Sequence, residues 1–368
     1  MKKITAVLLV LIMIISCVAM TSCGEVNDTV EVEGTYTRDY EGTTLKVYNW
    51  GEYISDGGEG SLHVNKAFEK LTGIKVVYST FDSNEVMYGK IKQGAEAFDI
   101  IIPSDYMIQR LISEDLLQKI DVSKLSNYKY IDEQYKNLYF DENNEYSVPY
   151  NVGMVGLIYN ETMVKEAPTS WSIMWDEQYK DQILTFDNPR DAFAICQFLL
   201  GIDLNTTDTA EWDSVAEKFK EQKKILQARV MDMVFNKMEG GNAAIAPYYA
   251  GDYLTMAENN PDLKFVYPEE GTNIFVDSIC IPKNANNYEA AMMYINFLLE
   301  PEVALANAEF IRYASPNTGV LNHADYSLKD NEILYPSEDK MPKTQYFHDL
   351  DPVVREYYQE LWKKIVNE

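Results

Sequence analysis

We expect this chain to adopt an α/β fold, with a parallel or mixed sheet that carries helices on both faces. The first reason is that short apolar runs rich in β-branched residues alternate with segments of helical periodicity. The second is the length of 368 residues, which is enough for two domains of ordinary size. The third is a hydrophobic content of 46%, which is enough for a full core.

The N-terminus has the pattern of an export signal, which we assign to residues 1–22. A basic MKK precedes an apolar stretch over residues 6–20, which is shorter than the roughly 20 residues that a membrane span needs. The following Met-Thr-Ser-Cys resembles the lipobox of bacterial lipoproteins, which implies cleavage before Cys23 and lipidation of that residue. A plain signal peptide with an incidental cysteine is the alternative. We therefore expect an exported protein, lipid-anchored on the extracytoplasmic or periplasmic side of a membrane.

Residues 23–44 are acidic and contain Thr and Gly without helical periodicity. We interpret them as a flexible tether between the lipid anchor and the folded body. Two cysteines remain in that body, Cys196 and Cys280, each within an apolar run. An exported setting permits a disulfide, but nothing in their spacing indicates a disulfide scaffold, which favours two buried free thiols.

The folded body begins with three predicted strands, at residues 45–49, 74–79 and 98–104. Residues 63–73 have a helical pattern, and Gly73 suits its C-terminal cap. Ligands of such folds bind at the carboxyl ends of the strands. The ends of the first and third strands, VYNWGEY and DIIIPSDY, are therefore candidates for a ligand site.

The later sequence predicts a second α/β unit. Its final helix begins at Asp351-Pro352, an N-cap residue followed by proline in the first turn. The other predicted elements are helices at 191–200 and 211–227, strands at 264–268 and 274–282, and two helices over 286–310 that are separated at Pro301.

The charge of the chain is strongly one-sided, with 58 acidic residues, 32 basic residues and a net charge of -26. Such a surface repels nucleic acid and anionic lipid and favours cationic ligands. The three histidines show no metal-ligand spacing, and the sequence contains no GxSxG, GxxxxGK[ST] or GxGxxG motif. With so many acids a carboxylate pair is uninformative, so a glycosidase stays open as an alternative. We expect a protein without catalytic residues, cofactor or metal.

Asp277 interrupts the apolar run IFVDSICI. A carboxylate within a buried strand is costly unless it is paired or hydrogen-bonded. Either Asp277 points outward or meets an internal base, or its partner is a cation supplied from outside. The acids at Asp187 and Asp191 pose a similar choice, because they either cap the following helix or face the ligand side of the fold.

Aromatic residues fall at the same junctions between elements. Each of them, taken singly, is explained by packing. Aromatic faces, however, attract cations and offer flat walls to methylene chains. Interleaved with junction acids, they suit an organic polycation with an aliphatic spine. The residues are Trp50, Tyr53, Tyr106, Tyr248, Tyr249 and Tyr313.

The stretches YNWGEYI, FDIIIPSDYMI, FVDSICIPKNA and YASPNTG occur in this order along the chain. In this order they resemble the spermidine/putrescine-binding proteins of bacterial polyamine ABC importers. The resemblance implies a two-lobed periplasmic-binding-protein fold of type II, in which the lobes close over a ligand by hinge bending. It places lobe one at 45–152 plus 276–321 and lobe two at 153–275 plus 322–368. It implies a monomeric receptor that delivers its ligand to a permease and its ATPase.

The same resemblance implies a ligand shell. In this sequence Asn188 stands where the family has an acid, with Asp187 adjacent, and Tyr248 and Phe275 stand where the family has tryptophans. Asp191 and Asp277 then remain as two anionic poles, which favours putrescine over spermidine. Another organic cation as ligand, or a sensor in place of an importer component, are the alternatives. The implied shell is Trp50, Tyr53, Ser104, Tyr106, Asn188, Asp191, Tyr248, Phe275, Asp277, Tyr313 and Gln345.

Overall fold

The computed structural model describes residues 26–367. The predicted signal peptide and the lipidation site at Cys23 lie outside the described residues. Within the described range, no helix combines the length and the apolar character that crossing a membrane requires.

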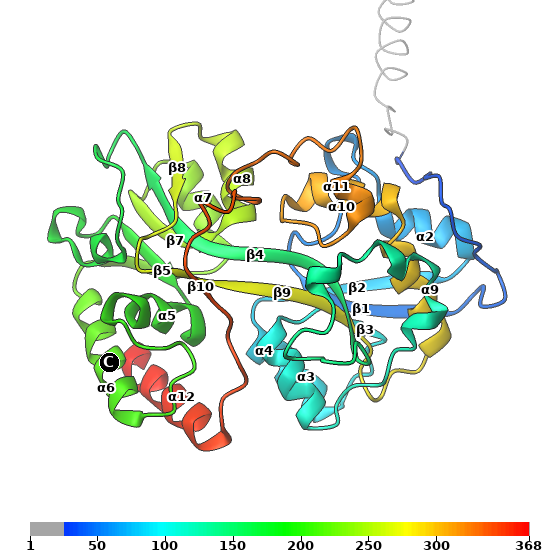
Figure 1. Ribbon diagram of the computed structural model, residues 1–368, viewed down its shortest axis with the longest axis horizontal. Coiled ribbons are helices and arrows are strands. Elements are labelled where there is room, and N and C mark those ends of the chain that lie inside the picture. The colour runs from blue at the N-terminus through cyan, green and yellow to red at the C-terminus, as the bar shows by residue number, and fades with distance from the viewer. Residues whose placement is uncertain (1–25, 368) are drawn as a thin grey trace, which may run out of the picture.

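Two lobes lie side by side and are joined by two long strands that run through both of them (Figure 1). These crossing strands are β4 (Ser147–Asn160) and β9 (Thr272–Cys280), which pair antiparallel with Val152 opposite Val276. We expected the lobe boundaries between residues 152 and 153 and between residues 275 and 276. These two points lie opposite each other on the paired strands β4 and β9. Every residue of β4 is buried, as expected for a strand covered on both faces.

The first lobe has three strands, in which β1 pairs parallel with both of its neighbours. Helices α2, α3 and α4 follow these strands, and α9, α10 and α11 complete the lobe after the chain returns along β9 (Figure 1). The bounds are β1 Thr44–Trp50, α2 Val64–Thr72, β2 Lys75–Phe81, α3 Asn84–Gln93, β3 Ile100–Ile101, α4 Asp105–Ser113, α9 Tyr288–Leu298, α10 Pro301–Ile311 and α11 Thr318–Leu321.

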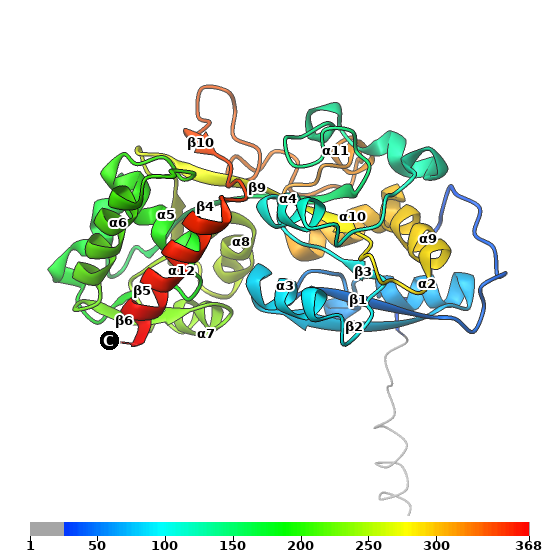
Figure 2. The ribbon, with the colours of Figure 1, turned by 90° about the horizontal axis from the view of Figure 1, so that it is seen from below.

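The second lobe has a parallel core of β5, β6 and β7, to which the antiparallel β8 is linked through β4. The last helix, α12, lies along α6 and α5 on the outside of this lobe (Figure 2). The bounds are β5 Ile183–Phe186, α5 Pro189–Leu200, α6 Thr209–Gln222, β6 Leu226–Val230, α7 Met233–Glu239, β7 Ile245–Tyr249, α8 Ala250–Asn259, β8 Leu263–Val266, β10 Thr344–Gln345 and α12 Pro352–Asn367.

The strands form one mixed sheet in the order β2-β1-β3-β9-β4-β7-β5-β6, with β8 beside β4 and β10 beside β9. The α/β fold class with a parallel or mixed sheet is thereby confirmed. Gly73 ends α2 with a φ of 74°, a left-handed conformation that glycine adopts without strain. The helix that we predicted over 211–227 is too long, because it ends at Gln222 and Leu226 already pairs with Ile183 of β5.

Each lobe has a hydrophobic core of its own. Cys196 lies in the core of the second lobe, and Cys280 lies on β9 among side chains of α4 and β3. Both thiols are free and buried, as the sequence favoured. Burial raises the pKa of both thiols, so both are unreactive at neutral pH.

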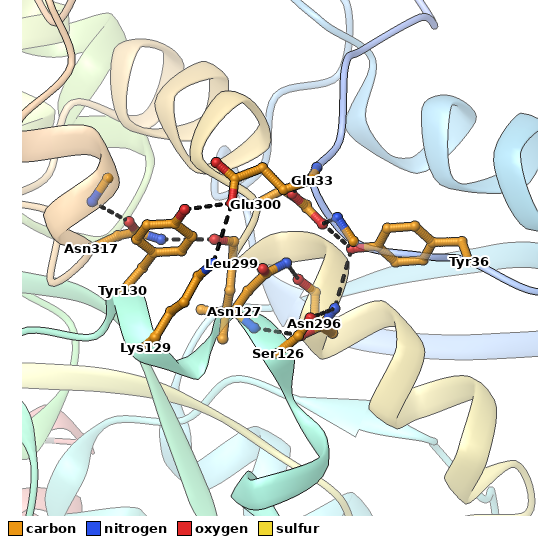
Figure 3. A network of polar contacts seen from close by, with 12 residues as sticks. Glu33, Tyr36, Ser126, Asn127, Lys129, Tyr130, Asn296, Leu299, Glu300 and Asn317 are labelled. Atoms are coloured by element: carbon orange, nitrogen blue, oxygen red, sulfur yellow. Dashed lines mark hydrogen bonds and ion pairs between the residues drawn. The ribbon is translucent and has the colours of Figure 1, made fainter.

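The segment that we predicted as a flexible tether lies instead against the first lobe over residues 27–42, and Figure 3 shows Glu33 and Tyr36 of this segment beside Glu300. We call these residues the N-terminal strap. Glu300, which is 0% exposed, accepts hydrogen bonds from the amides of Glu33 at 2.8 Å and Gly34 at 2.9 Å and from the hydroxyl of Tyr36 at 2.6 Å. A buried carboxylate needs such donors, and the strap supplies them.

Alternate side chains of the strap also face the protein. Val30, Val32 and Tyr36 pack against the core of the first lobe, and the Tyr36 ring meets Phe297 edge-on. The sequence analysis took the acids and threonines between them as a sign of solvation throughout. They are the outward half of an extended segment with a period of two.

Residues after 321, which we expected in lobe two, first pack on lobe one. Tyr326 is 2% exposed against α10 and α11, and the Tyr335 hydroxyl accepts a hydrogen bond from the Ser315 amide at 2.8 Å. The chain meets the second lobe first at Ile333, whose carbonyl accepts a hydrogen bond from the Tyr267 hydroxyl at 2.7 Å, and then through β10. This segment buries apolar side chains of α10 that would otherwise be exposed to solvent.

Candidate functional site

A cleft with about 830 Å³ of empty space lies between the lobes, beside the crossing strands. Its lining combines seven acids and nine aromatic residues, and it includes ten of the eleven residues of the predicted ligand shell. The acids are Asp82, Glu85, Asp105, Asp191, Asp232, Asp252 and Asp277, and the aromatics are Trp50, Tyr53, Phe81, Tyr106, Tyr248, Tyr249, Phe275, Tyr313 and Phe347.

The fold explains why these residues meet. Parallel strands of an α/β sheet direct the loops after their carboxyl ends to one edge, and in each lobe that edge faces the cleft. Lining residues accordingly end or follow one strand after another: Trp50 ends β1 and Tyr53 follows it, Asp82 follows β2, Asn188 and Asp191 follow β5, Asp232 follows β6, and Tyr249 ends β7 and Asp252 follows it.

Asp277 lies on β9 and is 3% exposed. Its Oδ2 accepts a hydrogen bond from the Tyr53 hydroxyl at 2.6 Å, whereas its Oδ1 is buried without a partner. No lysine or arginine of the described chain pairs with it. Burial raises the pKa of Asp277 to about 6, although hydrogen bonds from Tyr53 and Ser104 oppose the shift. The internal base considered as an alternative is therefore absent at this residue.

Asp191 reaches the cleft from the first turn of α5. The N-cap is Asn188, whose Oδ1 accepts from the Asp191 amide at 2.9 Å and whose Nδ2 donates to Asp191 Oδ2 at 2.8 Å. The Tyr249 hydroxyl donates to the same Oδ2 at 2.7 Å. Burial raises the pKa of the Asp191 carboxyl. Asn188 therefore caps the helix and also lines the cleft, and Asp191 lines the cleft beside it.

Asp187 does not replace the acid that the family has at position 188. Its side chain is exposed, pairs with Arg229 at 3.3 Å and lies outside the cleft lining. Asn188 already occupies the inward position and is held there by its capping bonds. The one-residue shift that the sequence suggested therefore does not occur.

Aromatic rings form a continuous wall through edge-to-face contacts. The Tyr53 and Tyr313 ring centroids lie 5.2 Å apart at 86°, and those of Tyr249 and Phe275 lie 5.5 Å apart at 81°. Trp50 packs against Phe81 at 4.5 Å, and its indole nitrogen is buried without a partner. Such a wall suits a chain of methylenes and can also face a cation.

Two glycines make room for this wall. A Cβ at Gly251 would lie 2.1 Å from the Tyr313 ring, and a Cβ at Gly153 would lie 2.3 Å from the Phe275 ring. Neither distance is possible between real atoms, so any side chain here would push a ring out of place.

At one end of the cleft, Ser104 and Tyr106 are held by neighbours from the same lobe. The Asn84 side chain donates to Ser104 Oγ at 3.1 Å and accepts from the Ser104 amide at 3.2 Å. The Tyr106 hydroxyl donates to Glu85 Oε1 at 3.0 Å. Burial raises the pKa of Glu85.

The sequence analysis missed five of the seven acids. Asp252 has a pKa raised to about 8 by burial and by the charges of Asp232 and Glu52. Asp105 is 0% exposed and accepts from the Val276 amide on β9 at 3.3 Å. A signal was present, since most of the missed acids follow strand ends. It was hidden by the number of acids in the chain, 58.

The comparisons with known proteins agree with this geometry. The family model described as bacterial extracellular solute-binding protein matches residues 95–344, more than half of the chain. The chain belongs to this family. The solute-binding protein is 35% identical over 323 residues to the spermidine/putrescine-binding periplasmic protein of Salmonella typhimurium, covering 86% of this chain and 91% of the relative. It is 29% identical over 350 residues to the putrescine-binding periplasmic protein PotF of Escherichia coli, covering 88% and 92%.

Solved structures show the same two-lobed fold. The spermidine/putrescine ABC transporter substrate-binding protein PotD of Streptococcus pneumoniae matches with a TM-score of 0.73 and 36% identity, over 88% of this chain and 99% of that one. The Tp0655 lipoprotein of Treponema pallidum matches with a TM-score of 0.74 and 27% identity over the same shares. The resemblance and the type of fold that the sequence predicted are confirmed, and the family consists of transport proteins that bind solutes.

Of the eleven residues of the predicted shell, Gln345 lies outside the cleft of the solute-binding protein, whereas Tyr248 lines the cleft and also packs on the core. Gln345 is absent from the cleft lining, because its Oε1 accepts from the Leu204 amide at 3.1 Å within β10. Tyr248 is 2% exposed and stacks on Phe186. The sequence analysis placed Tyr249 at a junction but not in the shell. Its hydroxyl donates a hydrogen bond to Asp191.

Proposed function

We propose that this solute-binding protein captures a polyamine, putrescine or spermidine, in its cleft and delivers it to the permease and ATPase of an ABC importer. The observation that carries the proposal is an excess of negative charge beside an aromatic wall. Seven carboxylates line one cleft, and Arg190 is the single basic residue among the described lining residues. The names of the relatives, which bind spermidine or putrescine, support the same class of ligand.

An alkylammonium group would supply the partner that Asp277 Oδ1 lacks. Charge-assisted hydrogen bonds of this kind are stronger than neutral ones, and excluding water from the closed cleft strengthens them further. Asp191, from the other lobe, would bind a second ammonium group. The methylenes between them would lie along Trp50, Tyr53 and Phe275. Capture needs no covalent step.

The structure removes the argument by which the sequence favoured putrescine over spermidine. The preference for putrescine rested on two anionic poles, Asp191 and Asp277. Five further carboxylates line the cleft, including Asp232 and Asp252. The number of acids therefore no longer separates a diamine from a triamine.

Calorimetric titration with putrescine, cadaverine, spermidine and spermine tests the proposal directly. We expect at least putrescine or spermidine to bind the wild type, and Asp277→Ala to weaken that binding by about 10- to 100-fold. Asp187→Asn, outside the cleft, is the matched control and should bind as the wild type does. If no polyamine binds the wild type, the ligand class is wrong.

We also propose that Cys23 carries a lipid that anchors a monomeric receptor at the membrane surface, as the Treponema relative is a lipoprotein. Replacing Cys23→Ala in the expressed full chain should release the protein from the membrane fraction. Retention of the variant in that fraction would contradict the anchor.

A further inference from the structure

Arg190 is a positive charge inside a cleft built for cations. It projects from the first turn of α5 and is 3% exposed. Its guanidinium has one hydrogen bond, from Nη2 to Asn205 Oδ1 at 3.3 Å, and its buried Nε has no partner. Within the described chain it forms no ion pair. A buried guanidinium without a paired carboxylate is costly and calls for an explanation.

Aromatic rings fix where this guanidinium lies. It is 4.4 Å from the centroid of the Phe347 ring, 5.6 Å from that of Tyr106 and 5.8 Å from that of Tyr358. Phe347 and Tyr106 also meet edge-on at 5.9 Å. The charge is therefore held by residues of both lobes and by α12.

The same place is the boundary of the cleft. A second cavity, with about 240 Å³ of empty space, shares Glu85, Tyr106 and Arg190 with the ligand cleft. Beyond this shared wall the cavity is lined by Arg110, which pairs with Glu114, and by Arg355, which pairs with Asp349. An amine chain extended past the wall would meet carboxylates that already have guanidinium partners.

The acids of the cleft fall into two groups relative to this wall. Arg190 acts electrostatically on Glu85 and Asp191. Asp252 instead interacts with Asp232 and Glu52. The charges of Glu85 and Asp191 are thus partly offset by Arg190, whereas the charged neighbours that act on Asp252 are other acids.

We propose, on the basis of the proposed polyamine-binding function, that Arg190 is an end stop that determines polyamine length and register. Its charge excludes an ammonium group from Glu85. A ligand then binds with two ammonium groups at Asp191 and Asp277, and any further ammonium group extends only toward Asp252 and Asp232. The residue acts on specificity by exclusion and makes no contact that the ligand needs.

The test is the ratio of spermine affinity to putrescine affinity, measured by calorimetry. Arg190→Met keeps an unbranched apolar stem between the rings and removes the charge. We expect the ratio to rise at least about tenfold, because Glu85 becomes available to a further ammonium group. Arg190→Lys retains the charge and should keep the wild-type ratio. A ratio within twofold of the wild type in Arg190→Met overturns the proposal.

Two further variants separate this idea from a general structural effect. Adding Glu85→Gln to Arg190→Met should abolish the gain. Glu85→Gln alone, in a cleft whose Arg190 is intact, should leave the ratio of spermine affinity to putrescine affinity at the wild-type value. A tenfold fall of that ratio in the single variant would show that an ammonium group of the longer amine binds at Glu85, and would overturn the end stop even if Arg190→Met does not fold. Failure of the wild type to bind any polyamine would instead reject the proposed function.

Discussion

In the ligand-free protein, the surroundings of Asp277 and Asp252 disfavour the ionised form of each carboxyl group. Burial raises the pKa of Asp277 to about 6, and burial together with neighbouring acids raises that of Asp252 to about 8. A bound ammonium group favours the ionised form and so draws the proton off. Ligand capture and proton release are therefore linked at these residues.

This linkage predicts how the ligand-free protein responds to pH. An aspartate in the unfolded chain titrates near about 3.9. Between that pH and about 6 for Asp277, or about 8 for Asp252, the unfolded chain has lost a proton that the folded protein retains. These groups should therefore lower the free energy of unfolding as pH rises through this window. Thermal unfolding of the ligand-free protein at pH 5.5 and 8.5 measures it, with Asp252→Asn expected to show a smaller decrease.

Polyamine affinity should have the opposite pH dependence. It should fall as pH is lowered from 8.5 to 5.5, because Asp252 and then Asp277 become protonated. Titrations in two buffers of different ionisation enthalpy should reveal protons released on binding at intermediate pH. An affinity that is constant over this range, with no proton release, would contradict the raised pKa values.

The residues of the cleft differ in how well they can be predicted from the sequence. Asp277 could be predicted because it interrupts an apolar strand, so its cost was visible. Asp232 and Asp252 could not, because acids in loops are ordinary in so acidic a chain. The role of Arg190 could not be predicted either, because its burial between rings from distant segments depends on tertiary contacts that no local pattern records.

Among the elements, α8 requires a glycine in its first turn, because a side chain there would collide with a ring of the cleft. Gly251 lies in its first turn against the Tyr313 ring. Gly251→Ala should displace that ring into the cleft and weaken polyamine binding by about tenfold or more, as expected when a well-packed site is overfilled. Gly89→Ala, in α3 with open space around the added methyl, is the matched control. It should bind normally and unfold at an equal or slightly higher temperature.

The N-terminal strap gives a second prediction at this scale. Glu300→Gln replaces the carboxylate that accepts three hydrogen bonds from the strap. Stability should fall by about 1–3 kcal/mol, since hydrogen bonds to charged groups are lost or weakened. Polyamine affinity should be unchanged because the strap is remote from the cleft.

Chemical unfolding with calorimetry checks both expectations for Glu300→Gln. The exposed Glu302, whose carboxylate meets His323, provides the control variant Glu302→Gln. Equal stability of the two variants would mean that the strap contributes little to the folded state.

At the scale of the whole molecule, the lobes meet on both sides of the cleft. Arg312 pairs with Glu258 at 2.7 Å, and Gln109 accepts from the Asp349 amide at 2.8 Å. Acids from both lobes face one another between these contacts. Closure is therefore opposed by like charges that a cationic ligand offsets.

Small-angle scattering should detect whether the lobes close when a cationic ligand offsets the repulsion between the acids. At pH 8 and low salt, we expect the radius of gyration to fall when a bound polyamine is added, as the lobes close. The decrease should be smaller at pH 5.5, which lies below the raised pKa values of Asp277 and Asp252, so that these acids carry less charge before ligand arrives. An unchanged radius at both pH values would mean that the lobes do not move on binding.

The alternation of strands and helices was enough to predict the α/β class, because hydrophobic periodicity reflects which face each element buries. The return of residues 326–335 to the first lobe was not predictable in this way. It depends on tyrosines covering α10, a contact between segments whose sequences carry no mutual signal. The docking of the strap was missed for the same reason.

The strap also bears on how the receptor would meet its transporter. Among the described residues, Asn27 is held to the first lobe by its carbonyl, which accepts from the His63 amide at 2.7 Å, and by its side chain, which donates to Gly60 at 3.1 Å. It stands four positions after Cys23, a reach of at most about 14 Å, against about 80 Å for a free tether to residue 45. A lipid at Cys23 would thus hold the His63 end of the first lobe close to the bilayer. The second lobe alone would be free to swing, and encounters with a permease would occur by lateral diffusion with one orientation already selected.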